Sequence, residues 1–444
     1  MVIQLPEHVK YIIDTLETAG YEAYAVGGCV RDTLLKRIPG DWDITTSATP
    51  QQVKAEFRRT VDTGIAHGTV TVMLDKCGYE VTTYRIDGEY EDARHPKEVI
   101  YTANLLEDLK RRDFTINAMA YNDTNGLVDA FNGIGDLKKG IIRCVGEPKE
   151  RFGEDALRML RAVRFAAQLG FSIDTATKEA ITALAPTLSK VSAERIQVEL
   201  VKLLTSANPQ EVRTLYETGI SKVILPEWNA MMETPQNNPH HCCSVGEHTI
   251  ETLKHTRPDR ILRLSAFLHD IAKPDCRTTD ANGIDHFYGH PEAGAVKAKE
   301  VLRGLKFDNA AIDAVRALVW GHDVNPALTD KSVRRTVRTI GATCYPMMFE
   351  LKRADILAQS VYKRTEKLEA LMQYEKLYRE IMDRQDCLSL KELAVNGRDL
   401  MELGIKQGKD IGRILNALLD IVVDDPQKNT KEYLTGYTLK NLFI

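Results

Sequence analysis

The stretch Gly27-Gly28-Cys29-Val30-Arg31-Asp32, followed by Asp41-Trp42-Asp43-Ile44, decides which fold this chain adopts. Alternate residues of a strand point to the same face, so a strand here would aim the carboxylates of Asp41 and Asp43 at one point. Two carboxylates at one point suit Mg²⁺, which proteins often hold together with substrate phosphates. Gly27 and Gly28 let backbone approach a phosphate, and a helix starting there would present its N-terminus to the anion. The pattern predicts phosphoryl or nucleotidyl transfer on metal ions, although Asp-x-Asp alone is also common in loops.

The whole chain has the composition of a soluble globular protein with several domains. It has 444 residues, of which 43% are hydrophobic and 27% charged, which leaves room for two to four domains. The net charge of −4 does not indicate a general nucleic-acid binder. Any RNA contact must therefore come from local basic clusters, which occur at Lys36-Arg37, Arg58-Arg59, Lys110-Arg111-Arg112, Lys138-Lys139 and Arg334-Arg335.

The cysteines and the N-terminal segment predict a cytoplasmic protein that does not bind membranes. The eight cysteines are scattered without a Cys-x-x-Cys pair, which fits a reducing compartment. Met1 to Tyr21 intersperses charged residues among apolar ones, so it predicts an amphipathic helix rather than a signal peptide. No stretch approaches the length of a membrane span.

The chain changes character along its length, which predicts an α+β fold. The first part mixes helices with strands expected at Tyr24–Gly27, Thr69–Leu74 and Tyr79–Tyr84, the last two joined by a turn at Lys76-Cys77-Gly78. From Glu154 onward the pattern is that of amphipathic helices, interrupted by the breaker-rich segment Pro235–Pro239. We expect a mixed α/β head at 1–145, a helical neck and body at 146–235, a helical domain at 240–384 and a helical tail at 385–444.

Two further segments carry residues suited to nucleotide binding. Arg111-Arg112-Asp113-Phe114-Thr115-Ile116-Asn117 places two guanidinium groups, which bind phosphate oxygens in pairs, before a predicted helix. In Glu154-Asp155-Ala-Leu-Arg158-Met-Leu-Arg161-Ala-Val-Arg164, Asp155 and Arg158 would share one helix face. An acceptor and a forked donor at fixed separation can read the Watson–Crick edge of a base. The alternatives are a surface basic turn and an intrahelical salt bridge.

These ordered segments resemble the motifs of class II tRNA nucleotidyltransferases, which are the CCA-adding enzymes and bacterial poly(A) polymerases. Ser192-Ala193-Glu194-Arg195-Ile196 is similar to their later neck motif, and the resemblance spans about residues 1–230. It implies a small nucleotidyltransferase head followed by a helical neck, body and tail that bind tRNA. It also implies two-metal nucleotidyl transfer without a nucleic-acid template.

The resemblance assigns roles to individual residues. It implies that Asp41 and Asp43 are the catalytic Mg²⁺ ligands, and Glu80 is a candidate third carboxylate. The nucleotide-binding residues it implies are Gly27, Gly28 and Arg31 for the triphosphate, Arg111, Asp113 and Asn117 for ribose and phosphates, Asp155 and Arg158 for selecting CTP and then ATP, and Arg161 and Arg164 near the triphosphate.

The segments Asp87–His95 and Gly64–Val70 favour full CCA addition over its closest alternatives. Enzymes that add only CC resemble this family but lack such a loop, and the second segment looks like the CCA-adding type. An A-adding enzyme and a poly(A) polymerase stay open as alternatives.

A second set of residues, in the region 240–384, predicts another metal site. His269-Asp270 lies within the apolar run Leu264–Lys273, where a buried polar pair is costly without partners, and a divalent metal would be a suitable partner. The spacing of the set resembles the HD superfamily of metal-dependent phosphohydrolases through His248, His269, Asp270, His290, His322 and Asp355. The resemblance implies a Mn²⁺, Ni²⁺ or Mg²⁺ site that hydrolyses phosphomonoesters or 2′,3′-cyclic phosphates.

Three functions therefore remain open from the sequence. The first is CCA addition to tRNA from CTP and ATP, with the HD-type domain as an accessory. The second is a metal phosphohydrolase whose head only binds nucleotide. The third is an RNA-binding scaffold with no turnover. For the histidine set alone, the alternative is a relic domain that only packs or holds tRNA.

Overall fold

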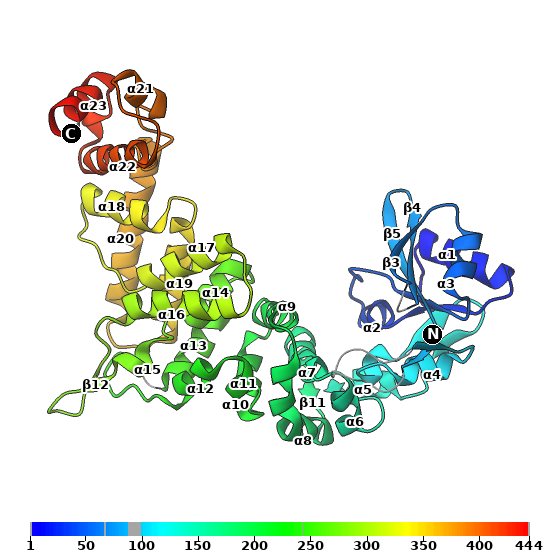
Figure 1. Ribbon diagram of the computed structural model, residues 1–444. Coiled ribbons are helices and arrows are strands. Elements are labelled where there is room, and N and C mark those ends of the chain that lie inside the picture. Colours follow the sequence, from blue (N-terminus) through cyan, green and yellow to red (C-terminus); the bar gives the residue numbers. More distant parts are fainter. Residues whose placement is uncertain (1, 66–67, 88–98, 242, 443–444) are drawn as a thin grey trace. The chain divides into compact units, whose positions relative to one another are not determined.

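The computed structural model describes residues 2–65, 68–87, 99–241 and 243–442, and the chain forms two compact units (Figure 1). The first unit comprises Met1–Ile224 and the second Leu225–Ile444. A mixed head followed by a helical remainder is the fold that the sequence predicts. The finer division into four domains stays a prediction, and most of the Asp87–His95 loop, together with His67, lies outside the described residues.

The first unit is built on a seven-stranded sheet in which only β2 and β5 run parallel. From one edge to the other the strands are β3 (Thr60–Gly64), β4 (Thr69–Leu74), β5 (Cys77–Thr83), β2 (Ile44–Thr46), β1 (Ala23–Val26), β8 (Ala120–Asn122) and β9 (Gly126–Val128). The three strands expected from the sequence are present. The parallel pair matters for function, because it places the start of β2 beside Val81 of β5.

The hairpin between β4 and β5 turns one residue earlier than predicted. Leu74 pairs with Cys77, so Asp75 and Lys76 form a two-residue turn, and Cys77 and Gly78 belong to the strand. Both turn residues have positive φ, 46° and 68°, as the common two-residue hairpin turn requires. The predicted turn at Lys76–Gly78 is wrong because Gly78 pairs with Met73 in the strand ladder. A Cβ at Gly78 would lie 2.8 Å from Thr71 Cγ2 on the neighbouring strand.

Helices complete the first unit. The predicted N-terminal amphipathic helix is α1 (Glu7–Thr18), which buries Val9, Ile12, Ile13 and Leu16. The head also contains α2 (Gly28–Leu34), α3 (Pro50–Glu56), α4 (Leu105–Lys110), α5 (Gly133–Lys139) and the small hairpin of β6 (Arg85–Asp87) and β7 (Val99–Tyr101). The helices that follow are α6 (Pro148–Glu154), α7 (Leu157–Leu169), α8 (Thr175–Leu184), α9 (Ala193–Leu204), α10 (Val212–Glu217) and α11 (Ser221–Ile224), with β10 (Ile141–Ile142) pairing with β11 (Ser172–Ile173).

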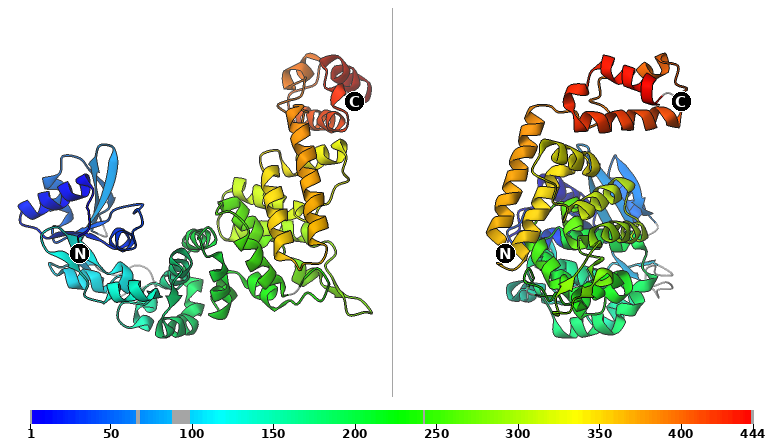
Figure 2. Two further views of the ribbon diagram at one scale, coloured as in Figure 1. Left: turned by 180° about the vertical axis from the view of Figure 1, so that it is seen from behind. Right: turned by 90° about the vertical axis from the view of Figure 1, so that its left-hand side faces the viewer.

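The second unit is almost entirely helical. Its body consists of α12 (Pro226–Glu233), α13 (Val245–Lys254), α14 (Arg260–Leu268), α15 (Lys273–Cys276), α16 (His290–Gly304), α17 (Asn309–Gly321), α18 (Asp330–Ile340) and α19 (Tyr345–Ala358), with the small hairpin of β12 (Thr278–Thr279) and β13 (Asp285–His286). The long helix α20 (Arg364–Asp383) leads from this body to α21 (Gly397–Glu402), α22 (Lys409–Asp424) and α23 (Lys431–Tyr437), as Figure 2 shows. The fully buried Trp228 packs against Phe267 with 4.8 Å between ring centroids, which anchors α12 to α14.

Candidate active site and a histidine cluster

The two aspartates of the opening motif lie just before β2, not within it. The strand begins at Ile44, and the ladder extends by one bond, in which Val26 N donates to Asp43 O at 3.0 Å. Asp41 is exposed and Asp43 half-buried. Burial raises the pKa of Asp43 to about 6, and the negative charges of Asp41 and Glu80 add to the rise. The charges of Asp41 and Glu80 thus both act on the Asp43 carboxylate, and a bound cation would relieve this repulsion.

Gly27 and Arg112 face one another beside these carboxylates. Gly27 has φ 81°, and a Cβ at this position would lie 2.9 Å from Arg112 Nη1, so only glycine fits. Arg112 also opposes the rise in the pKa of Asp43 through its positive charge. Its buried Nε has no hydrogen-bond partner among the described residues. Arg112 is thus a functional candidate that the sequence reading did not select.

Arg111, which was predicted to bind phosphate, is instead directed at a buried acid. Its Nε and Nη2 donate to Asp108 Oδ1 at 3.0 and 2.8 Å. Burial alone would raise the pKa of Asp108, but Arg111 and Arg112 outweigh it and the pKa is lowered. Arg112 also approaches Asp108, with Nη2 3.6 Å from Oδ2, and the phosphate-binding role of Arg111 stays a prediction.

Arg31, Asn117, Asp113 and Arg161 form one connected network. Arg31 Nη1 donates to Asn117 Oδ1 at 2.6 Å, and Asn117 Nδ2 donates to Asp113 Oδ1 at 3.0 Å. Arg161 closes the network through two bonds to Asp113 Oδ2, at 2.8 and 2.6 Å. Burial would raise the pKa of Asp113, yet Arg161 and Asn117 lower it to about 2. The predicted helix after Asp113 is only a short 3₁₀ turn, Thr115–Asn117, because this segment closes the network.

Phe165 lies at the centre of the arginine cluster. The guanidinium carbons of Arg31, Arg161 and Arg164 lie 5.1, 5.4 and 3.8 Å from its ring centroid. Such cation–π contacts hold positive groups close together that would otherwise repel each other. Glu199 of α9 adds the counter-charge, with Oε2 2.5 Å from Arg164 Nε. Sequence reasoning missed Phe165 and Glu199, since neither type by itself signals nucleotide binding.

Asp155 and Arg158 do not share a helix face as predicted. The chain leaves α6 at Asp155 with φ −141° and ψ 102°, and α7 begins at Leu157. Asp155 Oδ1 accepts a bond from Leu157 N at 3.1 Å, which explains the break. Arg195 binds both Asp155 oxygens, at 3.2 and 2.6 Å, whereas Arg158 donates to Glu154 at 2.6 Å. Each member of the predicted base-reading pair is therefore positioned by a different neighbour.

The predicted histidine set of the second unit comes together in one buried cluster. The metal-capable groups are His248, His269 and Asp270, and Asp270, His290 and His322, so Asp270 belongs to both. Asp355 joins through a 2.9 Å contact between its Oδ1 and His248 Nε2. These residues come from α13, the end of α14, α16, the end of α17 and α19.

The ring nitrogens of His290 and His322 are arranged as in metal ligands. Their Nδ1 atoms lie 2.8 and 2.6 Å from the carbonyl oxygens of Phe287 and Val319, so each Nδ1 must carry a proton and donate it. The two Nε2 atoms then face each other at 3.2 Å. Burial lowers the pKa of His290, which favours the neutral ring. The facing Nε2 atoms can share either a proton or a metal ion, and carbonyl-bound imidazoles are typical of metal sites.

Asp270 is the common anion of the cluster. Its Oδ1 lies 3.6 and 3.5 Å from the Nε2 atoms of His290 and His322, and its Oδ2 lies 3.2 Å from His269 Nε2. Neither oxygen accepts a well-aligned hydrogen bond in the described part of the chain, although Lys273 Nζ is 2.7 Å from Oδ2. Burial would raise the pKa of Asp270, but His269 and Lys273 outweigh it and hold the pKa well below its usual value.

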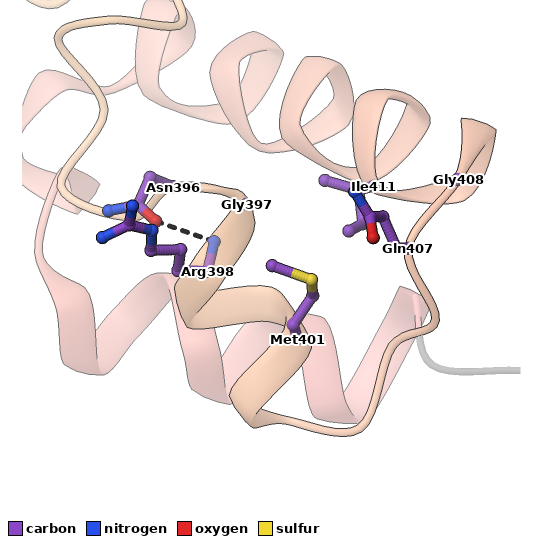
Figure 3. A pocket seen from close by; sticks show the side chains of 7 residues that line it. All are labelled: Asn396, Gly397, Arg398, Met401, Gln407, Gly408 and Ile411. Atoms are coloured by element: carbon purple, nitrogen blue, oxygen red, sulfur yellow. Dashed lines mark hydrogen bonds between the residues drawn. The ribbon is translucent and has the colours of Figure 1, made fainter.

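The second unit has one cavity at the histidine cluster and another in the tail, and their lining residues differ. A cavity of about 640 Å³ is lined by Asp270, His290, His322 and Asp355 together with polar and aromatic residues. The tail has a hollow of about 450 Å³, shown in Figure 3, whose lining residues are Asn396, Gly397, Arg398, Met401, Gln407, Gly408 and Ile411. Arg398 is the one charged residue among them, so we assign no chemistry to this hollow.

Comparison with known proteins identifies the family. A model of the poly A polymerase head domain matches residues 23–143, a model of the "Probable RNA and SrmB-binding site of polymerase A" matches 170–232, and a model of tRNA nucleotidyltransferase domain 2 matches 289–437. The CCA-adding enzyme of Levilactobacillus brevis is 38% identical over 97% of this chain and 96% of its own length. This chain belongs to the CCA-adding enzyme family.

Other members of the CCA-adding enzyme family agree with this assignment. The CCA-adding enzyme of Lactobacillus helveticus is 37% identical over 96% of this chain and 95% of its own length. The crystal structure of the Bacillus stearothermophilus CCA-adding enzyme in complex with CTP matches with a TM-score of 0.70 and 30% identity, covering 99% of this chain and 98% of that one. Among the described residues, no helix is both long and apolar enough to cross a membrane.

Proposed function

We propose that the protein adds CCA to the 3′ end of tRNA, taking the nucleotides from CTP and ATP without a nucleic-acid template. The observation that carries this proposal is that a head of the family's type places Asp41 and Asp43 directly before β2, with Arg112 beside Gly27. The names of the relatives support the substrate class. We place the activity in the cytoplasm, since the seven described cysteines are free thiols.

The head carboxylates fit a divalent metal because their repulsion favours a cation. Mg²⁺ held by Asp41 and Asp43 would activate the terminal 3′-hydroxyl and stabilise the leaving pyrophosphate. In the transfer, the 3′-hydroxyl loses its proton to solvent, its oxygen forms a bond to the α-phosphorus, the bond from that phosphorus to the bridging oxygen breaks, and pyrophosphate leaves. Arg112 and Arg31 lie beside Gly27 and Asn117, where they would hold the triphosphate.

Asp155 and Arg158 would select the base. Arg195 and Glu154 orient them in the free protein, so selection of C and then A depends on how these ion pairs rearrange around the incoming base. A carboxylate accepts and a guanidinium donates, and together they match the amino group and ring nitrogen that cytosine and adenine share.

Sequencing the ends of extended tRNA tests this proposal. Purified protein is incubated with Mg²⁺ and tRNA lacking its terminal CCA, with CTP, ATP or both. We expect growth by CC with CTP alone and one further A when ATP is added. Addition of A only to tRNA that already ends in CC would indicate an A-adding enzyme, and a long A tail a poly(A) polymerase.

We also propose that the histidine cluster is an HD-type metal site with phosphohydrolase activity. The facing Nε2 atoms of His290 and His322 support it, because with each Nδ1 donating to a carbonyl oxygen both Nε2 atoms can turn a lone pair towards one metal ion. The cluster of His248, His269, Asp270, His290, His322 and Asp355 suits Mn²⁺, Ni²⁺ or Mg²⁺. The metal, when bound, would supply an activated water for attack on phosphorus.

Two measurements test the histidine cluster as a metal site: the amount of metal bound to the protein and the rate of β-glycerol phosphate hydrolysis. After dialysis against Mn²⁺, we expect His290→Gln to bind less metal than the wild-type protein, by the amount that the cluster holds. His255→Gln is the matched control, since His255 lies outside the cluster and pairs with Glu251. Equal metal content in wild type and His290→Gln would contradict the proposal.

A further inference from the structure

One of the basic clusters of the sequence, Arg334-Arg335, lies on a helix face that is directed at the tail. The helix is α18, and a spacing of three and four residues places its cations on one face. These cations are Lys331, Arg334, Arg335 and Arg338. They contact α22, which carries Asp420 and Asp424 one turn apart (Figure 1). The two helices therefore meet with opposite charges.

The outer contacts between α18 and α22 are ion pairs. Arg335 binds both oxygens of Asp424, with Nε donating to Oδ1 at 2.6 Å and Nη2 to Oδ2 at 2.7 Å. Lys331 Nζ lies 2.9 Å from Oδ2 of the same carboxylate. One turn further along α18, Arg338 Nε donates to Asp420 Oδ1 at 2.5 Å. A single exposed ion pair contributes little, but a two-pronged guanidinium bond within a network can contribute measurably.

Arg334 forms the buried centre of this contact. Its side chain is 5% exposed, its Nε donates to Val423 O at 2.7 Å, and its Nη1 donates to Asp386 Oδ2 at 2.9 Å. Val423 lies at the C-terminal end of α22, where carbonyl groups lack helical partners and the helix dipole is negative. An arginine of the body therefore completes the end of a tail helix.

The tail nevertheless has a hydrophobic core of its own. The buried members of this core run from Cys387 to Leu434, and the partly buried apolar residues packed against it run from Leu403 to Tyr437. From α22 the core includes Leu418, Leu419 and Val422. The apolar face of α22 is thus buried within the tail, while its acidic side chains contact α18.

The chain passes from α20 into the tail through a short junction at residues 384–386. The helix ends at Asp383, and Gln385 adopts the left-handed conformation with φ 54°. Asp386 N donates to Ile381 O at 3.3 Å, a bond that closes the end of the helix. Because α20 stops here, it does not run on into the tail as one rigid rod.

We propose that α18 and α22 form an electrostatic latch that holds the tail on the body, and that the tail moves about the junction as one folded piece when the latch opens. The latch consists of the four cations of α18 and, on the tail, Asp420, Asp424 and the C-terminal end of α22. Salt favours opening, because the screening length falls from about 10 Å at 0.1 M to about 3 Å at 1 M. Such a contact can break without exposing a hydrophobic core. This inference is independent of both proposed activities.

Zero-length cross-linking of the full chain tests the latch. A carbodiimide joins a lysine amine to a carboxylate only where the two touch, so the yield of the Lys331–Asp424 cross-link, read by mass spectrometry, reports the closed latch. Arg338→Glu places a carboxylate opposite Asp420 and should lower that yield roughly 5-fold, a size that coupling within one ion-pair network commonly reaches. Exchanging the two charges, in Arg338→Glu combined with Asp420→Lys, should restore the yield.

Two controls accompany this measurement. Arg316→Glu makes the same change of charge on α17, where Arg316 lies 4.0 Å from Asp313 of its own helix, and it should leave the yield unchanged. The pair Lys178–Glu217 of the first unit, 2.7 Å apart, gives a reference yield within each protein. In wild type, the Lys331–Asp424 yield should fall more steeply with NaCl than this reference, because several ion pairs must break together.

The outcomes decide whether the ion pairs act together. An unchanged Lys331–Asp424 yield in Arg338→Glu, or a yield that stays low after the charge exchange, would overturn the latch. Hydrogen exchange of peptides from α22 tests whether the tail stays folded, and amide protection should be the same in wild type and Arg338→Glu. Faster exchange in the variant would mean that the tail unfolds rather than moves as one piece, which would also overturn the proposal.

Discussion

The polar network of the head and neck and the histidine cluster of the second unit are both largely buried, but they are balanced differently. In the first, Asp113, Asp155 and Glu199 each have an arginine partner. In the second, the Nε2 atoms of His290 and His322 face each other at 3.2 Å, and Asp270 lies among three imidazoles and Lys273. The first network therefore pairs carboxylates with arginines, whereas the second gathers residue types that bind metal ions.

In the first unit, the residues that position the site differ from the residues that would carry out the chemistry. The arginine network holds residues in place through bonds that already exist, whereas burial and the charges of Asp41 and Glu80 raise the pKa of Asp43 against the opposing charge of Arg112. In the second unit the residues that would hold a metal are themselves buried, so structure and chemistry coincide there. Substitutions in the head should therefore change either activity or stability, whereas substitutions in the cluster should change both.

The largest effect is expected from Asp43→Asn. Removing one negative ligand of a metal site should lower nucleotide incorporation about 1,000-fold, as loss of strong electrostatic stabilisation typically does. Folding should be unaffected, since burial already penalises the charge of Asp43. Incorporation of labelled CTP into tRNA lacking CCA measures the effect. Asp62→Asn, an exposed residue paired with Lys54, is the control, and equal rates in both variants would contradict the assignment.

The next effect is expected from His269→Gln in the cluster. Loss of an imidazole that contacts Asp270 and His248 should weaken Mn²⁺ binding about 100-fold, which titration calorimetry measures. It should also lower the melting temperature in Mn²⁺ more than in chelator, because bound metal stabilises only the folded state. A variant that binds Mn²⁺ as tightly as the His255→Gln control would show that the cluster only packs.

The pH dependence of the free energy of unfolding tests whether Asp113 is held as a charged partner of Arg161 in the first network. The pKa of Asp113 is about 2 in the folded protein against a usual value of 3.8. A lowered pKa contributes stability above the unfolded value, and that stability is lost as pH falls from 3.8 towards 2. We expect Asp113 to contribute about 2 kcal/mol to the free energy of unfolding.

Urea unfolding of wild type and Asp113→Asn at about pH 5 and about pH 2 measures this contribution. The gap between the two proteins should shrink by most of that amount at the lower pH. A gap that is the same at both values would mean that Asp113 is not held as a charged partner of Arg161.

The smallest effect is expected from Arg195→Met. This change removes the partner of both Asp155 oxygens, so Asp155 would lose its fixed orientation. We expect the ratio of kcat/KM for CTP and ATP to change about 10-fold, equivalent to roughly 1.4 kcal/mol. Overall incorporation should fall less. Lys190→Met, at an exposed position, is the control, and an unchanged ratio would place base selection elsewhere.

Much of the fold could be predicted because it follows from local patterns. Alternating β-branched residues predicted β4 and β5, and the spacing of apolar residues predicted α1. The errors arose where side chains compete with regular structure. Asp155 binds the amide of Leu157 and breaks a helix that periodicity alone would continue.

The sequence predicted which residue types the candidate site contains, but not which neighbours their side chains contact. Arg111 and Arg112 are adjacent in the sequence, and only the fold shows that both approach Asp108 and that Arg112 also faces Gly27. Phe165 and Glu199 were not predicted, because their roles depend on arginines that the packing of α7 on α9 brings close to them. The histidine cluster was predictable because an imidazole and a carboxylate in an apolar helix need partners.

The measurement that tests the account most directly assays both activities in the same two variants. Wild type, Asp43→Asn and His269→Gln are each assayed for CCA addition to tRNA and for Mn²⁺-dependent phosphate release from β-glycerol phosphate. We predict that Asp43→Asn loses only CCA addition and that His269→Gln loses only hydrolysis. Loss of both activities in either correctly folded variant, or retention of hydrolysis in His269→Gln, would contradict two chemically independent sites.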